Sequence, residues 1–340
     1  MRLKCPAAFF QIILCLELKQ AMIPPIKNFS LGTRIMVMFG FLMFNYLLFP
    51  SVASLVVGQF YGMDKIIDVL SGNMHGDSEK YVFLFVQGVG SLGAFAFTSL
   101  LVSQMETGFV LKRLGLNIRP ALKFFVMGVF AVLVAQVFTQ FLVEVNQQIP
   151  LPKALKFLEE QEAQAEKITN TVLAGNGWMM FMANVLVLAV IPAIGEELFF
   201  RGLLLGDLLK SKVNPAFAII GTGLLFSISH FEFGNMLAIW ALGSFLGYLY
   251  YTSGSLWLSM AAHFTNNFLV ILFKYLYNSG YIKSDIAEAT FPLYAVVISA
   301  AVFMLCLFVI NKWRRPVDFS IQLSAPVLDE EEGYGLNNEE

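Results

Sequence analysis

Charged residues are scarce in this chain. Only 14% of its 340 residues are Asp, Glu, Lys or Arg, whereas a soluble domain has about 25%, and 57% are hydrophobic, against about 45–50%. The net charge is −2, so the composition offers no basic surface for nucleic acid, and we expect no nucleic-acid partner. This balance excludes an ordinary soluble protein, and we expect the lipid bilayer to surround most side chains.

Several catalytic patterns are also absent. The three cysteines lack CxxC spacing, which excludes a zinc knuckle and a disulfide framework: Cys5, Cys15 and Cys306. A serine intramembrane protease would need a GxSxG-like nucleophile within a hydrophobic run, and there is none. An aspartyl protease would need two aspartates within such runs, whereas Asp207 stands alone near a basic loop. These two protease classes therefore fit the sequence poorly.

Long hydrophobic runs, by contrast, are abundant. A transmembrane helix needs about 20 mostly apolar residues. Runs of that length predict eight spans, at residues 33–57, 82–104, 121–144, 177–200, 215–231, 236–252, 256–277 and 292–311. The sequence therefore predicts an all-α, polytopic membrane bundle of about eight transmembrane helices.

Basic residues between the predicted spans indicate their orientation. They follow the second, fourth and eighth spans: Lys112, Arg113, Arg119 and Lys123; Lys210 and Lys212; Lys312, Arg314 and Arg315. In an eight-span chain these three loops lie on one side, which the positive-inside rule makes cytoplasmic. We therefore predict an integral protein of the cell (inner) membrane with both termini in the cytoplasm.

The spans divide the chain into five parts. These are an N-terminal segment (1–32), the first transmembrane helices (33–175), a core with polar motifs (176–275), the last transmembrane helix (276–315) and a disordered acidic cytoplasmic tail (316–340). The apolar start is interrupted by Glu17 and Lys19 and lacks a cleavage site, so we do not expect a cleaved signal; an interfacial segment and a true start at Met22 both stay open. Helical periodicity at 151–170 predicts an amphipathic external helix.

The fourth predicted span contains a cluster of charges. A charge within a span costs at least about 2.5 kcal/mol, so such residues indicate a functional site. Glu197 and Arg201 are four residues apart in the favoured acid-before-base order, and we expect them to neutralise each other. Glu196 points about 100° away and keeps its carboxylate free to act as a base. The structural alternative is a charge cluster that marks a helix end.

Two further motifs place polar groups in later spans. Phe226 and His230 share one helix face through i, i+4 spacing, and so do His263 and Asn267, with Asn266 beside them. Each motif alone could serve helix packing through interhelical hydrogen bonds. A free carboxylate, two imidazoles and an amide together exceed what packing requires, and they predict one buried polar site.

The residue types in this set suit amide hydrolysis. A glutamate and a histidine can hold and deprotonate a water for attack on a carbonyl, or help to bind a metal that does so. A second histidine and an asparagine supply N–H donors for the oxyanion that forms.

The three motifs resemble those of the CAAX protease and bacteriocin-processing family, intramembrane peptidases that include the type II CAAX prenyl endopeptidase. The family pattern is EExxxR, FxxxH and HxxxN/D on successive membrane helices. This chain has all three in order, and the stretch Ser253 to Trp257 (SGSLW) is also typical of the family. The resemblance covers residues 176–275.

The resemblance implies roles for the motif residues. Glu196 and His230 would activate the attacking water, and His263 and Asn267 would stabilise the oxyanion. Four residues would support the site: Glu197, Arg201, Phe226 and Asn266. We expect an intramembrane endopeptidase that cleaves a membrane-associated or lipidated substrate, either a peptide or a prenylated protein.

Cofactor use stays open. No HExxH motif is present, because His230 is followed by Phe231 and Glu232. A glutamate-activated water is the favoured mechanism. A divalent metal such as zinc, held by Glu196, His230 and His263, is the alternative.

Two other functions also stay open. One is a non-catalytic immunity or scaffolding protein that binds a partner in the same cavity, and the other is a proton-coupled transporter that uses Glu196 and His230 as a relay. The predicted spans also conflict in depth: Glu196 lies near the cytoplasmic surface, and His230 roughly 20 Å below it. Either the fourth helix runs on to about Lys210 or the two helices are tilted.

Overall fold

The computed structural model describes residues 26–152, 156–175, 177–285, 289–314 and 317–322, and all its regular structure is helical. A 3-10 turn, Ile26–Asn28, precedes the helices α2 (Leu31–Tyr61), α3 (Met63–Leu70), α4 (Asp77–Ser91), α5 (Thr98–Thr107), α6 (Val110–Arg113), α7 (Leu122–Gln147), α8 (Lys156–Leu173), α9 (Trp178–Asn184), α10 (Ile191–Glu197), α11 (Gly206–Lys210), α12 (Pro215–Ile228), α13 (Met236–Ser253), α14 (Leu256–Asn278), α15 (Leu293–Trp313) and α16 (Phe319–Gln322). This confirms the predicted all-α polytopic bundle.

Seven helical stretches are long and apolar enough to cross a membrane within the part of the chain that the structure describes: Leu31–Tyr61, Asp77–Thr107, Leu122–Gln147, Trp178–Lys210, Phe233–Ser253, Leu256–Asn278 and Leu293–Trp313. The chain is therefore an integral membrane protein. The predicted span at 215–231 is shorter than expected, because α12 has only 14 residues, or about 21 Å, and ends at Ile228. Phe231 has a left-handed φ of 55°, which turns the chain toward α13.

The predicted fourth span continues well beyond residue 200. From Trp178 to Lys210 the chain forms one continuous helical stretch, in which π-helical segments at Val185–Val190 and Leu198–Leu205 flank α10. Glu196 therefore lies 14 residues, or about 21 Å, from Lys210, and α12 carries the chain about the same distance from Pro215. The first of the two alternatives for the depth conflict is correct.

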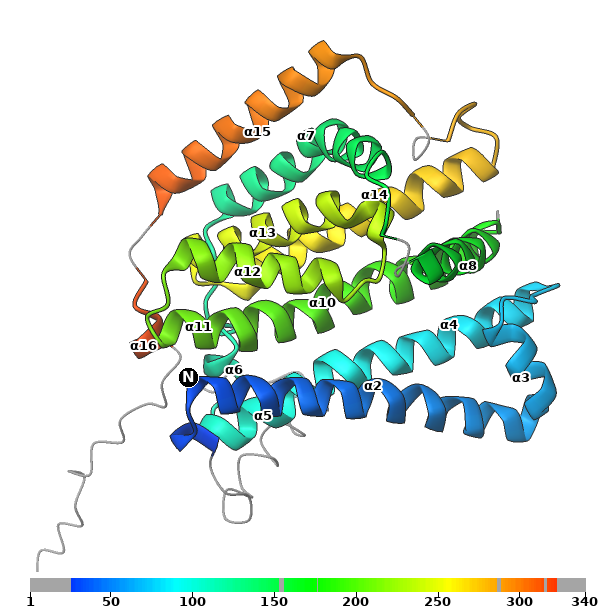
Figure 1. The fold of residues 1–340 in the computed structure, drawn as a ribbon, viewed down its shortest axis with the longest axis horizontal. Coiled ribbons are helices and arrows are strands. Elements are labelled where there is room, and N and C mark those ends of the chain that lie inside the picture. The colour runs from blue at the N-terminus through cyan, green and yellow to red at the C-terminus, as the bar shows by residue number, and fades with distance from the viewer. Residues whose placement is uncertain (1–25, 153–155, 176, 286–288, 315–316, 323–340) are drawn as a thin grey trace, which may run out of the picture.

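The long helices run roughly parallel to one another (Figure 1). Helices α2, α4 and α5 form one side of the bundle, the stretch α9–α11 packs beside them with α12, α13 and α14, and α7 and α15 form the opposite side (Figure 1). The start of α2, the connection from α11 to α12, and α16 all lie at the same end (Figure 1). The described parts of the chain therefore begin and finish at one end of the bundle.

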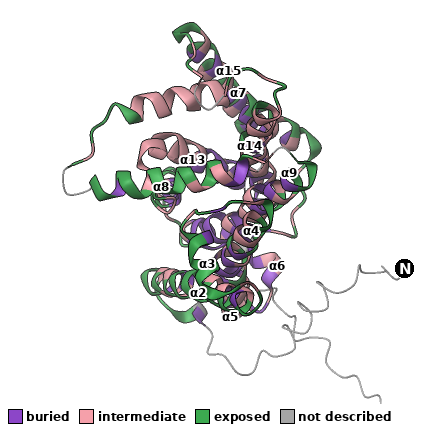
Figure 2. Cartoon of the chain, turned by 90° about the vertical axis from the view of Figure 1, so that its right-hand side faces the viewer, coloured by how far each residue is buried: buried purple, intermediate pink, exposed green. Residues whose placement is uncertain are grey.

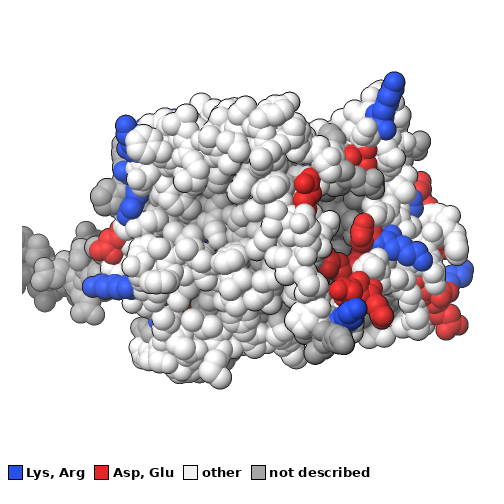
Figure 3. All heavy atoms as spheres, turned by 45° about the horizontal axis from the view of Figure 1, so that its top comes forward, with Lys and Arg blue, Asp and Glu red and all other residues white. Residues whose placement is uncertain are grey.

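Charged side chains lie mainly toward the ends of the bundle (Figure 3), and exposed apolar side chains lie on its outer side. On the face shown in Figure 3, Lys, Arg, Asp and Glu gather toward the two ends of the molecule, and a broad uncharged stretch lies between them. Exposed residues line the outer side of α2 (Figure 2), and many of them are large and apolar, including Phe44, Leu47 and Phe60. Such a surface suits lipid rather than water. The side that faces the cytoplasm stays a prediction.

The amphipathic helix predicted at 151–170 corresponds to α8, with residues 153–155 outside the described part. Its position at a membrane surface stays a prediction. The acidic tail predicted at 316–340 falls mostly on residues 323–340, which also lie outside the described residues, as do residues 1–25. The first part of that tail folds: α16 places Phe319, which is 4% exposed, against the rings of Tyr250 and Tyr251.

Candidate active site

Glu196 occupies the middle of the long stretch Trp178–Lys210. A π-helical turn inserts an extra residue and shifts the register of the side chains, and such turns are frequent at functional sites. Here one π-helical segment lies on each side of α10, so Glu196 is held between two register shifts. Its side chain is 13% exposed, and its Oε2 accepts no hydrogen bond from any described residue. The site therefore contains a buried carboxylate oxygen that has no hydrogen-bond partner among the described residues.

Two imidazoles converge on this free oxygen. His230, which follows the end of α12, places Nε2 3.8 Å from Glu196 Oε2, and His263 of α14 places Nε2 3.9 Å from it. Both distances are too long for direct hydrogen bonds. They are close to the roughly 4 Å that separates two acceptors of one bridging water. The structure therefore brings together three of the four residues that the sequence predicts to be catalytic.

The partners of the two Nδ1 atoms indicate which ring nitrogens carry protons. His230 Nδ1 lies 2.7 Å from the carbonyl oxygen of Phe226, and a carbonyl only accepts, so Nδ1–H is the donor. His263 Nδ1 donates in the same way to Glu197 Oε1, at 2.9 Å. In their neutral forms both histidines therefore present the lone pair of Nε2 toward Glu196.

The predicted pair of Glu197 and Arg201 forms. Arg201 Nη1 donates to Glu197 Oε1 at 2.5 Å, and Nη2 donates to the carbonyl of Gly243 in α13 at 2.7 Å. Both charged residues are fully buried. A buried ion pair depends on further hydrogen bonds to its members, and here His263 and Gly243 supply one each, while Glu197 Oε2 and Arg201 Nε have no partner among the described residues. The pair therefore fixes the distance of α10 from α13 and orients the ring of His263.

Phe226 fills the space between these groups. Its ring is 1% exposed, and its centroid lies 4.5 Å from Arg201 Cζ, a distance typical of a cation–π contact. The same ring lies 4.5 Å from the ring of His230 and meets the ring of His263 edge-on at 5.6 Å. The phenylalanine of the FxxxH motif thus restricts both imidazoles and excludes water from the arginine.

The two asparagines of α14 have different surroundings. Asn267 lines the same cavity as Glu196 and His230, and its Nδ2 donates to the carbonyl of Leu188 at 3.3 Å. Asn266 points toward α7, although its Nδ2 also donates to Asn267 Oδ1 at 3.3 Å. Asn267 is therefore the amide that can reach a substrate, and Asn266 supports it.

A cavity of about 860 Å³ gives access to the site. Glu196, His230 and Asn267 form one wall. The opposite wall comes from α2, α3 and α4 and is mostly apolar, with Tyr46, Leu47, Pro50, Leu55, Met63, Leu70 and Val86 among its residues. Glu232 also lines the cavity, and no Lys or Arg is among its described lining residues. The motifs did not indicate this second wall, because it lies outside residues 176–275.

The arrangement fits a tetrahedral zinc ion poorly. Two ligands at zinc bond lengths of about 2.0–2.1 Å would lie about 3.4 Å apart, whereas Glu196 Oε2 is 3.8 and 3.9 Å from the two Nε2 atoms. Within the described part of the chain, no group of three or more His, Cys, Asp or Glu side chains is placed to hold a metal ion.

A second group of buried charges was missed at the sequence level. Asp207, which has no second aspartate beside it in the predicted spans, is ion-paired with arginines: its Oδ1 accepts from Arg113 Nη2 at 2.6 Å, and its Oδ2 lies 2.9 Å from Arg34 Nε. Arg113 also donates to Glu106 and, at 2.9 Å, to the carbonyl of Gly202. The two positive and two negative charges cancel, and the network joins α2, α5, α6 and α11.

This network explains why the helix continues past residue 200. Asp207 is fully buried, and a lone carboxylate there would end a membrane helix or force it toward water. Arg113 lies in a loop whose basic residues indicated only orientation, and Arg34 and Glu106 lie near the ends of two predicted spans. The four charged residues near span ends could have indicated a buried network, but which of them pair with one another depends on the tertiary structure.

Comparisons with known proteins agree with the motifs. Residues 178–269 match the family described as Rce1-like, type II CAAX prenyl endopeptidase Rce1-like. This supports the predicted resemblance. The chain is also 36% identical over 112 residues to the uncharacterized protein YyaK of Bacillus subtilis (strain 168), a match that covers 31% of this chain and 38% of that protein. No solved structure matches the chain significantly.

Proposed function

We propose that this protein is an intramembrane endopeptidase that hydrolyses a peptide bond with a water activated by Glu196 and His230. The observation that carries the proposal is the free Oε2 of Glu196, which faces two imidazole Nε2 atoms at 3.8 and 3.9 Å in the wall of a large cavity. Acceptors at this separation suit a water molecule that donates one hydrogen to each of two of them.

The chemistry follows from these acceptors. A water between Glu196 Oε2 and His230 Nε2 loses a proton to one of them as its oxygen attacks the carbonyl carbon of the substrate. The carbonyl oxygen then becomes an oxyanion, and the same proton passes to the amide nitrogen as the C–N bond breaks. Phe226 keeps His230 in this role, because its carbonyl accepts from Nδ1 and leaves Nε2 free.

Stabilisation of the oxyanion is assigned to Asn267 and His263. Asn267 has a second N–H beyond the one that binds Leu188. His263 donates from Nε2 only as an imidazolium, because its Nδ1 is committed to Glu197.

The substrate is proposed to be a peptide or protein segment at the membrane, including lipidated ones. The cavity wall formed by α2, α3 and α4 is mostly apolar and accommodates a lipid chain or hydrophobic side chains. A prenylated substrate is suggested by the family description of residues 178–269. We further propose that the basic end of the bundle faces the cytoplasm in the cell membrane.

The test is peptide cleavage by the protein purified in detergent. The panel contains quenched fluorescent peptides with and without a prenyl group, and the variants are Glu196→Gln and His230→Ala. Glu166→Gln, which changes an exposed carboxylate on α8, is the control. Turnover by the wild type and the control, with loss in both site variants, supports the proposal. Loss of turnover in the presence of a chelator would support the alternative mechanism with a divalent metal. If no peptide were cleaved, a non-catalytic binding protein would be favoured.

A further inference from the structure

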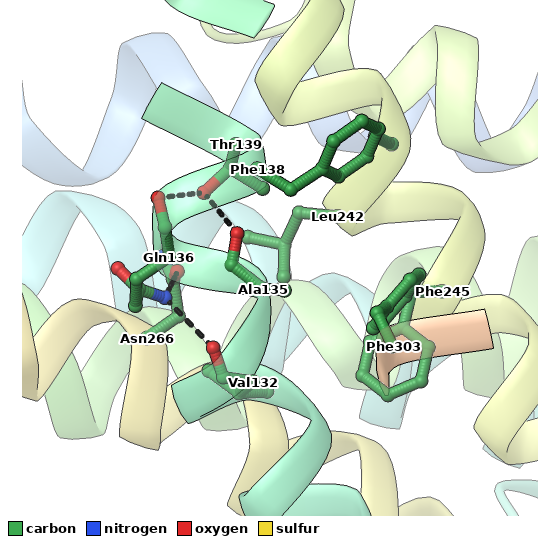
Figure 4. A pocket seen from close by; sticks show the side chains of 10 residues that line it. Val132, Ala135, Gln136, Phe138, Thr139, Leu242, Phe245, Asn266 and Phe303 are labelled. Carbon is green, nitrogen blue, oxygen red and sulfur yellow. Dashed lines mark hydrogen bonds between the residues drawn. The ribbon is translucent and has the colours of Figure 1, made fainter. Parts of the chain in front are cut away.

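Side-chain amides from α7 and α14 form a continuous chain that ends at the candidate site. Gln136 Nε2 donates to the carbonyl of Val132 at 3.1 Å and to Asn266 Oδ1 at 3.2 Å, as Figure 4 shows. Asn266 Nδ2 donates to Asn267 Oδ1, and Asn267 Nδ2 donates to the carbonyl of Leu188, each at 3.3 Å. The chain thus runs from α7 through α14 to the π-helical segment that precedes α10.

The two backbone carbonyls at its ends determine the direction of every bond. A carbonyl only accepts, so Gln136 must present its NH2 group to Val132, and Asn267 must present its NH2 group to Leu188. The same nitrogen of Gln136 also donates to Asn266, so Asn266 must present its side-chain oxygen to Gln136. Asn266 is then left with its nitrogen toward Asn267, and this matches the oxygen that Asn267 presents. A flip of any one amide would place two donors or two acceptors in contact.

We infer that Gln136 is a positioning residue for catalysis, which acts through Asn266 to keep the N–H group of Asn267 at the cavity. This inference rests on the proposed peptidase function and extends it. Gln136 lies in α7, outside the residues that match the family model, and no motif in the sequence indicates it. Without it, Asn266 could rotate by 180° and present oxygen to Asn267, which would favour an amide oxygen where the oxyanion needs a donor.

Two replacements of Gln136 distinguish a reversed hydrogen bond to Asn266 from the simple loss of that hydrogen bond. Gln136→Glu is isosteric, but its carboxylate can only accept, so it forces Asn266 to present nitrogen to α7 and oxygen to Asn267. Gln136→Met removes the contact without reversing it. We expect kcat to fall about 10- to 100-fold in Gln136→Glu, a fraction of the roughly 100- to 1,000-fold loss that follows removal of an oxyanion donor. Gln136→Met should lose less, and KM should hardly change in either variant.

The control comes from the small pocket between α7, α13, α14 and α15 that Gln136 and Asn266 line (Figure 4). Thr139 lines it beside Gln136 (Figure 4), but its hydroxyl donates only to carbonyls of its own helix, at Ala135 and Gln136. Thr139→Val therefore perturbs the pocket and leaves the amide chain intact, and its kcat should equal that of the wild type. A loss in Thr139→Val as large as in Gln136→Glu would mean that any change in this pocket is harmful, and the inference would fall.

A double-mutant cycle tests the route to the site. If Gln136 acts through Asn267, Gln136→Glu should lower kcat in the wild type but have little further effect in Asn267→Ala. Equal losses in the two backgrounds would overturn the inference, and so would a fully active Gln136→Glu.

Thermal unfolding in detergent separates this inference from the peptidase proposal. Gln136→Glu should lower the Tm more in an Asn266→Leu background than in the wild type, because Asn266 can turn its NH2 group toward the new carboxylate and leucine cannot. Gln136→Met should lower the Tm less in that background, because the partner of Gln136 is already absent. If no variant or wild type cleaves any peptide but this coupling is seen, the peptidase proposal fails while the amide chain stands. If the coupling is absent, the inference fails even for an active enzyme.

Discussion

Two adjacent glutamates should respond to the same substitution in opposite ways. Glu196→Gln keeps the shape of the side chain and removes the negative charge. Because Oε2 of Glu196 accepts no hydrogen bond from the described residues, the substitution breaks no bond of that atom. We therefore expect the free energy of unfolding to change by less than about 1 kcal/mol. Catalysis should suffer far more, since loss of a general base typically costs about 100- to 10,000-fold in kcat.

That loss corresponds to about 2.7 to 5.4 kcal/mol of transition-state stabilisation at about 1.36 kcal/mol for each factor of ten. Glu197→Gln has the reverse balance, because it breaks the buried pair with Arg201 and weakens the bond from His263. Breaking a buried ion pair by removing one partner costs about 3 to 5 kcal/mol. Glu197→Gln should therefore lower the Tm clearly, and its effect on activity should accompany this loss of structure.

The assay measures kcat and Tm on the same detergent preparations of the wild type and both variants. The expected result is an inactive but stable Glu196→Gln and a destabilised Glu197→Gln. A Glu196→Gln protein that keeps more than a tenth of wild-type kcat would refute its assignment as the base. A large fall in Tm for Glu196→Gln, with no fall for Glu197→Gln, would show that the two carboxylates have exchanged roles.

Three further predictions concern the surrounding structure. Gly223→Ala should lower the Tm, because the new Cβ would lie 2.5 Å from Ser244 Oγ and 2.7 Å from its backbone nitrogen; an unchanged Tm would argue against this close contact of α12 with α13. Arg113→Met should lower the free energy of unfolding by about 3–5 kcal/mol, because it leaves Asp207 without its partner. The double variant with Asp207→Asn should recover part of the lost Tm, because the remaining charges of Arg34 and Glu106 balance. If the Tm losses of the two single variants simply added in the double variant, the pairing of Arg113 with Asp207 would be refuted. Glu232→Lys should raise kcat/KM for substrates with acidic residues near the scissile bond relative to basic ones, measured by paired peptides, and an unchanged ratio would place Glu232 away from the bound substrate.

Much of the fold was predictable because the bilayer imposes a simple rule on sequence. Every spanning segment must be apolar for about 20 residues and must satisfy its own backbone, so long apolar runs indicate helices almost directly. The error at α12 has a local cause. The predicted span extended to residue 231, but α12 ends at Ile228 and Phe231 has a left-handed φ that a helix does not contain; hydrophobicity does not report φ.

Part of the candidate site was also predictable from the sequence, and part was not. Helix periodicity was enough to separate Glu196 from Glu197 and to pair the latter with Arg201, because residues four apart on one helix always meet. It was also enough to place His263 and Asn267 on one face. These are relations within one helix, where the geometry is known before the fold.

Relations between helices were decided only by the tertiary structure. The sequence alone determined an all-α membrane protein with three motifs suited to amide hydrolysis. Packing decided that Asp207 is neutralised by Arg34 and Arg113, and that Gln136 continues the amide chain from Asn267. It also decided that α2, α3 and α4 supply the second wall of the cavity. The physical reason is that periodicity describes the faces of each helix but not which faces meet, since every apolar face in a bilayer has both lipid and other helices as possible neighbours.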